Sequence, residues 1–182
     1  MDETRQELEI RDLQPGDEEA VRAATLAAFR EFESALPPVE WAKWSVHLAD
    51  VEARRRRSQT IVAVECGLFG VVDYSPSSMS ELRVGATARY LPAEWAVLSA
   101  LAIAPQFRGS GIGRRLVGEC LRRARRDREA SLSLLTLDVM TAGRCLYQGL
   151  GFRLHARVGE WAGHEMFAYV LPLDESGSLT PQ

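Results

Sequence analysis

The chain has 182 residues and a formal net charge of −3 at pH 7, which fits one globular domain and indicates neither a strongly acidic nor a strongly basic partner. Because it holds no apolar run of about 18 residues, we expect no membrane span. The first five residues lack the apolar core of a secretory signal, so we expect a cytoplasmic protein. Cys66, Cys120 and Cys145 include no C-x-x-C pair. They are expected to be buried free thiols, without a disulfide or a metal site.

The first predicted elements are a strand and a helix. Residues 8–13 alternate apolar and polar side chains, as a half-buried strand does. Asp17 follows a Pro-Gly turn and is a candidate N-cap for the next helix. That helix presents a broad apolar face over residues 21–32.

A second helix is predicted after Pro38, with Trp41 and Trp44 at the spacing of core residues. Both tryptophans fit either core packing or the lining of a substrate pocket. The helix ends in four consecutive arginines, residues 54–57, which are expected to form a solvated face.

A β-hairpin and an irregular segment follow. Residues 60–65 and 68–73 are apolar runs separated by a Cys-Gly turn, which predicts the hairpin. The segment 75–92 has no periodicity, although Leu82 and Val84 could form a short strand. A loop of this length in a compact domain is more often functional than idle, and we expect it near the active cleft.

The most informative stretch joins a strand to a helix. Residues 95–103 form a short apolar run typical of a buried strand, and apolar residues recur at helical spacing from Leu116 onward. Gly109, Gly111 and Gly113 lie between them. Glycines at such a junction allow a tight turn and a close approach of the backbone to a ligand.

This junction predicts an anion-binding site. The first N–H groups of a helix have no intrahelical partner and carry a partial positive charge, so they suit phosphate or pyrophosphate. Arg108 and Arg114 add fixed charge on either side. The dinucleotide fingerprint G-x-G-x-x-G is excluded because Arg114 stands where it requires glycine. A P-loop is excluded because Gly-Lys-Ser/Thr is missing.

The remaining elements are a strand at 132–139, a short helix from residue 140 or 141, and a final antiparallel pair at 151–155 and 165–171. The chain turns polar after Leu173. We therefore expect one domain over residues 8–173 and a polar tail at 174–182.

Two motifs resemble those of the GNAT superfamily of N-acetyltransferases. The run Q/R-x-x-G-x-G/A fits Gln106–Gly111 or Arg108–Gly113, and Gly143–Phe152 is similar to the family's A-x-x-L-Y-x-x-x-G-F run. The resemblance covers residues 8–173 and implies an α+β (mixed α/β) fold. In that fold a splayed, mostly antiparallel sheet of six to seven strands is flanked by about four helices.

The resemblance also implies acetyl-CoA as the acyl donor. The backbone of Leu101, Ala102 and Ile103 would pair with the pantetheine arm. N–H groups of the glycine loop would hold the pyrophosphate; with Arg108, these cofactor-binding residues are Gly109, Ser110, Gly111, Ile112, Gly113 and Arg114. A β-bulge at Leu98 or Ser99 would free an N–H for the developing oxyanion.

For catalysis, the resemblance implies Tyr147 as the general acid that protonates the departing CoA thiolate; the other interpretation is an aromatic ring packed under the sheet. Glu94, just before the motif strand, is the leading general base, although its spacing differs from the family's glutamate. Asp73, Glu165 and His164 are weaker candidates, and water alone could carry the proton.

One further residue departs from the family. Many members have an asparagine about seven residues before the motif tyrosine, where this chain has Met140. The protein N-terminal acetyltransferases that rely on that asparagine are therefore a poorer guide.

The resemblance implies an N-acetyltransferase that acts on an amine by direct transfer in a ternary complex. A non-catalytic acyl-CoA sensor is the alternative. The arginine-rich helix after Gly113 could instead bind nucleic acid, but aromatic residues between its basic ones are few, and no nucleic-acid or membrane partner is expected. The amine acceptor, the acyl length and a homodimer, which is common in the family, are left open.

Overall fold

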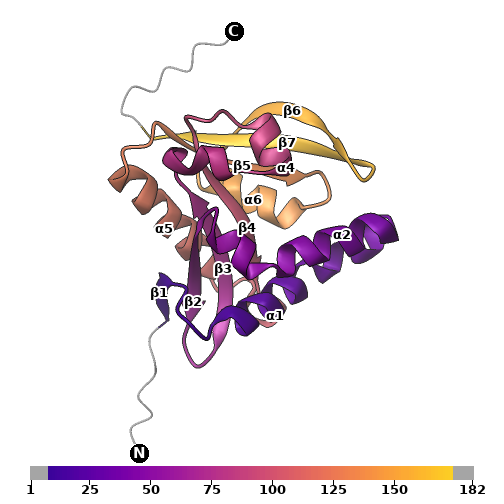
Figure 1. Cartoon of the computed structure of the whole chain (residues 1–182), viewed down its shortest axis with the longest axis vertical. Helices are drawn as coiled ribbons and strands as arrows, with labels where there is room; N and C mark the ends of the chain where they lie inside the picture. Colours follow the sequence, from indigo (N-terminus) through magenta and orange to yellow (C-terminus); the bar gives the residue numbers. More distant parts are fainter. Residues whose placement is uncertain (1–7, 174–182) are drawn as a thin grey trace, which may run out of the picture. The chain divides into compact units, whose positions relative to one another are not determined.

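The computed structural model describes residues 8–173; the predicted tail at 174–182 lies outside them. Seven strands form one sheet in the order β1-β2-β3-β4-β5-β7-β6 (Figure 1). The pairs β1–β2, β2–β3, β5–β7 and β6–β7 run antiparallel, whereas β4 and β5 run parallel. This mixed, mostly antiparallel sheet with several helices confirms the predicted fold class.

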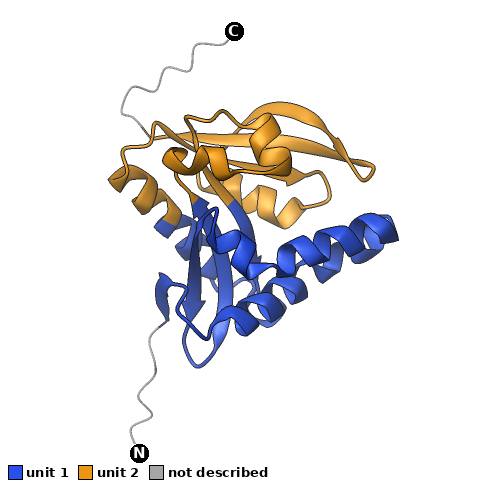
Figure 2. Cartoon of the chain, viewed as in Figure 1, with its two compact units in different colours: residues 1–74, 99–119 blue, residues 75–98, 120–182 orange. Residues whose placement is uncertain are grey.

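The chain divides into two compact units, which Figure 2 shows in different colours. The first unit combines Met1–Tyr74 with Ser99–Glu119, and the second combines Ser75–Leu98 with Cys120–Gln182. Strand β4 (Ala96–Ile103) and helix α5 (Ile112–Arg126) each contribute residues to both units.

The first unit holds most of the amino-terminal elements. They are β1 (Glu9–Asp12), α1 (Glu18–Phe29), the 3-10 helix η1 (Arg30–Ala35), α2 (Pro38–Ala49), α3 (Val51–Arg55), β2 (Gln59–Val64), β3 (Leu68–Ser75, up to Tyr74) and the 3-10 helix η3 (Pro105–Phe107). Helix α1 packs against α2. The core of this unit includes Val21, Val51, Val62, Val71 and Ala102, because β2 and β3 are apolar on both faces.

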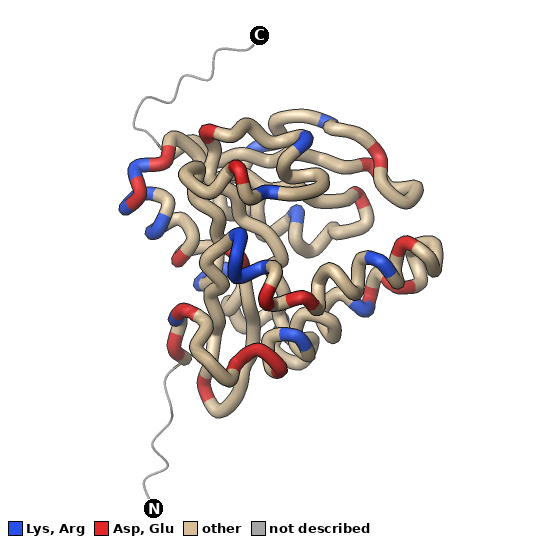
Figure 3. The backbone as a smooth tube through the Cα atoms, viewed as in Figure 1, with Lys and Arg blue, Asp and Glu red and all other residues tan. Residues whose placement is uncertain are grey.

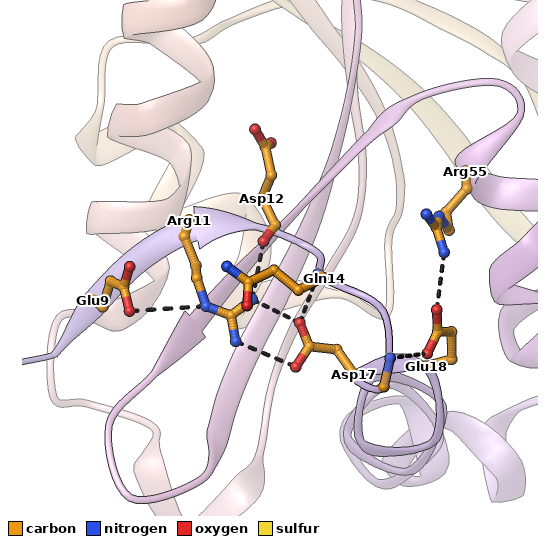
Figure 4. A network of polar contacts seen from close by, with 8 residues as sticks. Glu9, Arg11, Asp12, Gln14, Asp17, Glu18 and Arg55 are labelled. Carbon is orange, nitrogen blue, oxygen red and sulfur yellow. Dashed lines mark hydrogen bonds and ion pairs between the residues drawn. The ribbon is translucent and has the colours of Figure 1, made fainter.

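Helix α1 begins at the predicted place but with a different cap. Asp17 occupies the N-cap position, yet its side chain caps no helical N–H group. Its carboxylate instead accepts hydrogen bonds from Arg11, at 2.6 Å, and from the N–H of Gln14 (Figure 4). The hydrogen bond from Arg11 lowers the pKa of Asp17 despite partial burial. Asp17 therefore stabilises the turn between β1 and α1 rather than the first turn of the helix.

The second unit contains the carboxyl-terminal strands and two helices. Its elements are the 3-10 helix η2 (Ser77–Leu82), α4 (Gly85–Tyr90), β5 (Ser131–Leu137), α6 (Thr141–Gly149), β6 (Arg153–Trp161) and β7 (His164–Pro172). Leu91, Val97 and Ala168 form a core cluster against which Leu135 and Val158 pack. The predicted closing antiparallel pair is confirmed, although β6 extends well beyond residue 155.

The segment 75–92 is helical, so the predicted strand at Leu82 and Val84 is wrong. Leu82 ends η2, Val84 precedes α4, and both side chains are exposed. Buried Arg83 fixes the segment by donating to the carbonyl oxygens of Pro92, at 3.0 Å, and of Trp95. These bonds join distant positions, so periodicity could not reveal them.

The arginine run 54–57 is only partly the predicted solvated face. Arg54 is buried and donates to both carboxylate oxygens of Asp73, at 2.7 and 3.2 Å. It also donates to Thr25 Oγ1 and to the carbonyl of Leu48, while Thr60 donates to Asp73. This buried network joins α1, α2, α3, β2 and β3.

The prediction that all three thiols are buried is also wrong. Cys120, in α5, is buried, whereas Cys66 in the hairpin turn and Cys145 on α6 are exposed. All three are free thiols.

Candidate active site

The predicted anion-binding loop lies between β4 and α5. After β4 the chain makes the short helix η3, then an open turn, and α5 starts at Ile112. Gly109 and Gly111 have φ angles of 78° and 84°, a region that other residues rarely adopt. These two glycines are therefore required by the backbone, whereas Gly113 lies within the first turn of α5.

The main-chain N–H groups of residues 109–114 donate no hydrogen bond to any other residue that the structure describes. The first such bond of the helix is from Arg115 N–H to the carbonyl of Gly111. A row of unpaired N–H groups at a helix start is electropositive and suits an anion. The exposed Arg114 side chain makes no polar contact within the described residues and adds a cation there.

Residues of strand β3 contact the segment between β4 and the glycine loop. The rings of Phe69 and Phe107 stack with centroids 3.7 Å apart, and the N–H of Ala104 donates to the carbonyl of Phe69 at 2.9 Å. Beside them, a Cβ on Gly70 would lie 2.7 Å from Ile103 Cδ1 and 3.1 Å from the carbonyl of Ala102. The loop therefore follows a close approach of β3 to β4, at which any side chain larger than that of glycine would have to displace its neighbours.

The side chain of Arg108, which is predicted to contact the cofactor, forms an ion pair and hydrogen bonds with other residues of the chain. It pairs with Glu31 at 2.9 Å and donates to the carbonyls of Ala28, at 2.8 Å, and Ile103, at 3.5 Å. Its N–H donates to the carbonyl of Pro105. In this structure the guanidinium thus contacts the end of α1 and η1.

The pairing of β4 with β5 ends close to the position at which the family resemblance implies a bulge. Pairing with β5 covers Ala96 and Val97, and Ala100 has a φ of 49°, unusual for a residue with a side chain. Of the candidates, Leu98 is buried and Ser99 half-buried. The irregular residue lies one position beyond Ser99. Further along, Ala102 is buried while Leu101 and Ile103 are half-buried.

Tyr147 and Glu94 belong to the second unit. Tyr147 lies on α6 with its ring buried and edge-on to Phe152, at a centroid distance of 5.8 Å. Burial and the proximity of Cys120 raise the pKa of its hydroxyl, so Tyr147 is a neutral proton donor at physiological pH. Both interpretations of this residue, packed aromatic and acid, remain compatible with its position.

Glu94 is exposed in the turn before β4 and makes no hydrogen bond within the described residues. Each of the other candidate bases contacts a charged side chain of opposite sign or, for His164, a carboxylate. Asp73 is buried with Arg54, Glu165 pairs with Arg157, and His164 Nδ1 lies 2.7 Å from Asp138. Burial opposes ionisation of Asp138, but hydrogen bonds from His164 and the N–H of Glu165 outweigh it and lower its pKa.

Trp41 and Trp44 lie on α2 in a cluster of half-buried aromatic rings. The Trp44 ring meets Phe29 edge-on at 5.1 Å and Trp41 at 6.1 Å, while Phe32 lies 6.1 Å from Phe29. All four rings remain partly exposed. The cluster joins α1, η1 and α2.

Charged residues of both signs are distributed over both units (Figure 3). On α5 the arginines are not all solvated, because Arg123 is buried. Among the described residues, no three His, Cys, Asp or Glu side chains gather as a metal site would require. None of the helices in residues 8–173 combines the length and apolarity needed to cross a bilayer.

Comparison with known families agrees with this geometry. The model of the acetyltransferase (GNAT) domain matches residues 56–154, more than half of the chain. The chain belongs to the GNAT acetyltransferase family. No curated protein sequence matches it.

Solved GNAT structures share the fold at low sequence identity. A GNAT family acetyltransferase from Brucella melitensis in complex with acetyl-CoA is 24% identical, with a TM-score of 0.61 and coverage of 97% of this chain and 93% of the other. The PaiA N-acetyltransferase from Thermoplasma acidophilum in complex with coenzyme A is 15% identical, with a TM-score of 0.66 and coverages of 89% and 98%. The ribosomal-protein-S18-alanine N-acetyltransferase from Escherichia coli is 16% identical, with a TM-score of 0.63 and coverages of 97% and 100%.

Within the first unit, then, the structure brings together the backbone of Leu101–Ile103, the glycine loop and Arg114. Three residues that sequence reasoning missed also contribute there: Phe69, Gly70 and Glu31. An aromatic residue within an apolar strand (Phe69) and an acidic residue in a charged helix (Glu31) leave no sequence signal. Only Gly70, inside an apolar strand, is a recognisable sign of close backbone approach.

Proposed function

We propose that this chain transfers the acetyl group of acetyl-CoA to a primary amine by direct attack within a ternary complex, with residues 8–173 acting as one acetyltransferase domain. The observation that carries the proposal is the row of unpaired N–H groups at residues 109–114. Membership of the GNAT family and relatives solved with acetyl-CoA or CoA support the same donor.

The proposed roles follow from the chemistry of the side chains and backbone. N–H groups of residues 109–114, with Arg114, would hold the pyrophosphate, and the backbone of Leu101–Ile103 would pair with the pantetheine amides. A backbone N–H of β4 near Leu98 and Ser99, where β4 leaves β5, would stabilise the negative charge on the thioester oxygen.

The transfer makes a C–N bond and breaks the C–S bond of the thioester. Tyr147 would give its proton to the departing thiolate. Its hydroxyl is protonated at neutral pH, but burial, which raises its pKa, also makes it a weaker acid. Glu94, or water, would take one proton from the acceptor ammonium to give the neutral amine that attacks. The second proton, lost by the nitrogen as the amide forms, would restore the Tyr147 hydroxyl or leave through water. The half-buried rings of Trp41 and Trp44 are proposed to line the acceptor side.

Calorimetry with coenzyme A, followed by a thiol-release assay with a panel of amines, tests the proposal. Gly111→Val is expected to abolish detectable heat, because valine cannot adopt a φ of 84° at low cost and would displace the N–H groups. Gly118→Ala, within the helix α5 that follows Gly111 and with nothing within 4 Å of the new methyl group, is the control and should bind normally. Absence of heat with the unaltered chain would refute the proposal.

A non-catalytic acyl-CoA sensor is the second candidate. The exposed position of Glu94, without a hydrogen bond in the described part of the chain, favours it, because a general base is normally oriented by a partner. Tight CoA binding with no thiol release for any amine would support the sensor. Release with one amine class, lost in Tyr147→Phe, would support the enzyme.

A further inference from the structure

Arg108 connects the glycine loop to the end of a helix that is distant in sequence. Its guanidinium lies 2.9 Å from the carboxylate of Glu31 and donates to the carbonyl of Ala28 at 2.8 Å. Ala28 is in the last turn of α1, and Glu31 is in η1. One side chain thus spans the loop and the α1–η1 corner within the first unit.

This contact places a positive charge and a hydrogen-bond donor at the carboxyl-terminal end of α1. The last carbonyl groups of a helix lack intrahelical donors and carry a partial negative charge, yet the last turn of α1 contains no basic residue. The C-cap residue, Arg30, pairs with Glu33, and Arg108 adds a second cation and a donor to the Ala28 carbonyl from elsewhere in the chain. Glu31 then holds the guanidinium in a second, charge-assisted contact.

We propose that Arg108 is a positioning residue, which uses Glu31 and the Ala28 carbonyl to hold the phosphate-binding loop and so couples cofactor binding to the order of residues 28–36. The inference rests on the proposed function of the same loop. It gives Arg108 a different task from the direct phosphate contact that its motif position suggests.

The positioning role and the direct phosphate contact predict opposite effects of Glu31→Ala on the affinity for coenzyme A. Glu31 is connected to the loop through Arg108. If Arg108 positions the loop, Glu31→Ala loosens it and raises the dissociation constant of coenzyme A about twofold to fivefold, as expected for a partly exposed ion pair. If Arg108 contacts phosphate directly, removal of its protein partner frees the guanidinium, and affinity stays the same or increases. Unchanged or tighter binding would therefore overturn the proposal.

Glu33→Ala is the matched control. Glu33 is in the same 3-10 helix and pairs with Arg30 at 3.8 Å, so its loss should leave the dissociation constant unchanged. Thermal unfolding of the two ligand-free variants should coincide, because both pairs are at the surface. A lower midpoint for Glu31→Ala alone would mean that the pair acts on stability, against a positioning role.

Hydrogen exchange measured with and without coenzyme A tests the coupling itself. Residues 28–36 should become protected on binding in the unaltered chain and in Glu33→Ala, but not in Glu31→Ala or Arg108→Met. Binding without protection in the unaltered chain overturns the coupling and leaves the proposed function standing. No binding at all refutes the proposed function instead.

Discussion

At the scale of single residues, Tyr147 combines a buried ring with a hydroxyl whose pKa is raised above the ordinary value of 10.0. A raised folded-state pKa means that the neutral form is favoured on folding. Its contribution to stability is fully present below the unfolded value and is lost as the pH rises through the folded value. At neutral pH the hydroxyl is therefore protonated, and the fold loses stability only where the pH is high enough to ionise it.

We predict that the tyrosinate absorbance of Tyr147 develops above pH 10, later than that of a free tyrosine. The difference between alkaline titrations of the unaltered chain and Tyr147→Phe isolates this signal among four tyrosines. The unaltered chain should also lose more stability than Tyr147→Phe above pH 10. A difference signal that titrates below pH 10 would contradict the burial of the hydroxyl.

The Arg54–Asp73 pair is a second residue-scale feature, with side chains 5% and 4% exposed. Removal of one member of a buried pair leaves the other charge desolvated without compensation. We predict that Asp73→Ala lowers the free energy of unfolding by about 3–5 kcal/mol, measured by urea denaturation.

Glu40→Ala is the comparison for this prediction. Glu40 pairs with Lys43 at 3.0 Å, but the lysine side chain is 68% exposed, so the loss should be below about 1 kcal/mol. Equal effects of the two substitutions would show that the Asp73 network is no stronger than a surface pair.

At the scale of elements, the approach of β3 to β4 decides where the glycine loop starts. We predict that Gly70→Ala lowers the free energy of unfolding by about 1–3 kcal/mol, the usual range for overpacking, because its methyl group meets Ile103, Leu116 and a fixed carbonyl at 2.7–3.1 Å. It should also weaken coenzyme A binding, since β4 leads into the loop.

Gly118→Ala provides the opposite case in the same unit. Its methyl group meets nothing within 4 Å, and alanine is favoured over glycine inside a helix by about 1 kcal/mol. Thermal unfolding should therefore shift down for Gly70→Ala and up for Gly118→Ala. A shift in the same direction for both would refute the close contact at Gly70.

The elements also show what could be predicted from sequence. Strong periodicity placed the hairpin, α5 and the closing strands, and glycine spacing located the loop, because these signals are local. The burial of Arg54 depends on Asp73, 19 residues away, and that of Arg83 on carbonyls of Pro92 and Trp95. Neither partner is visible in a run of charges or an aperiodic segment, so the sequence predicts a solvated face at residues 54–57 and a strand at Leu82 and Val84 instead.

At the scale of the whole molecule, the chain passes between its two units within continuous elements. Because the two units share β4 and α5, unfolding of one unit disrupts these elements and destabilises the other unit. A small chain with such sharing is expected to unfold in one cooperative transition.

The four tryptophans allow the cooperativity of unfolding to be measured by fluorescence. Trp41 and Trp44 lie in the first unit, and Trp95 and Trp161 in the second. A variant with Trp41→Phe and Trp44→Phe reports by fluorescence on the second unit alone, and one with Trp95→Phe and Trp161→Phe on the first. For each variant, we predict that the urea midpoint from fluorescence coincides with that from far-ultraviolet circular dichroism, which reports on all helices and strands. Because β4 and α5 continue through both units, a fluorescence midpoint clearly separated from the circular dichroism midpoint in either variant would show that the units unfold independently.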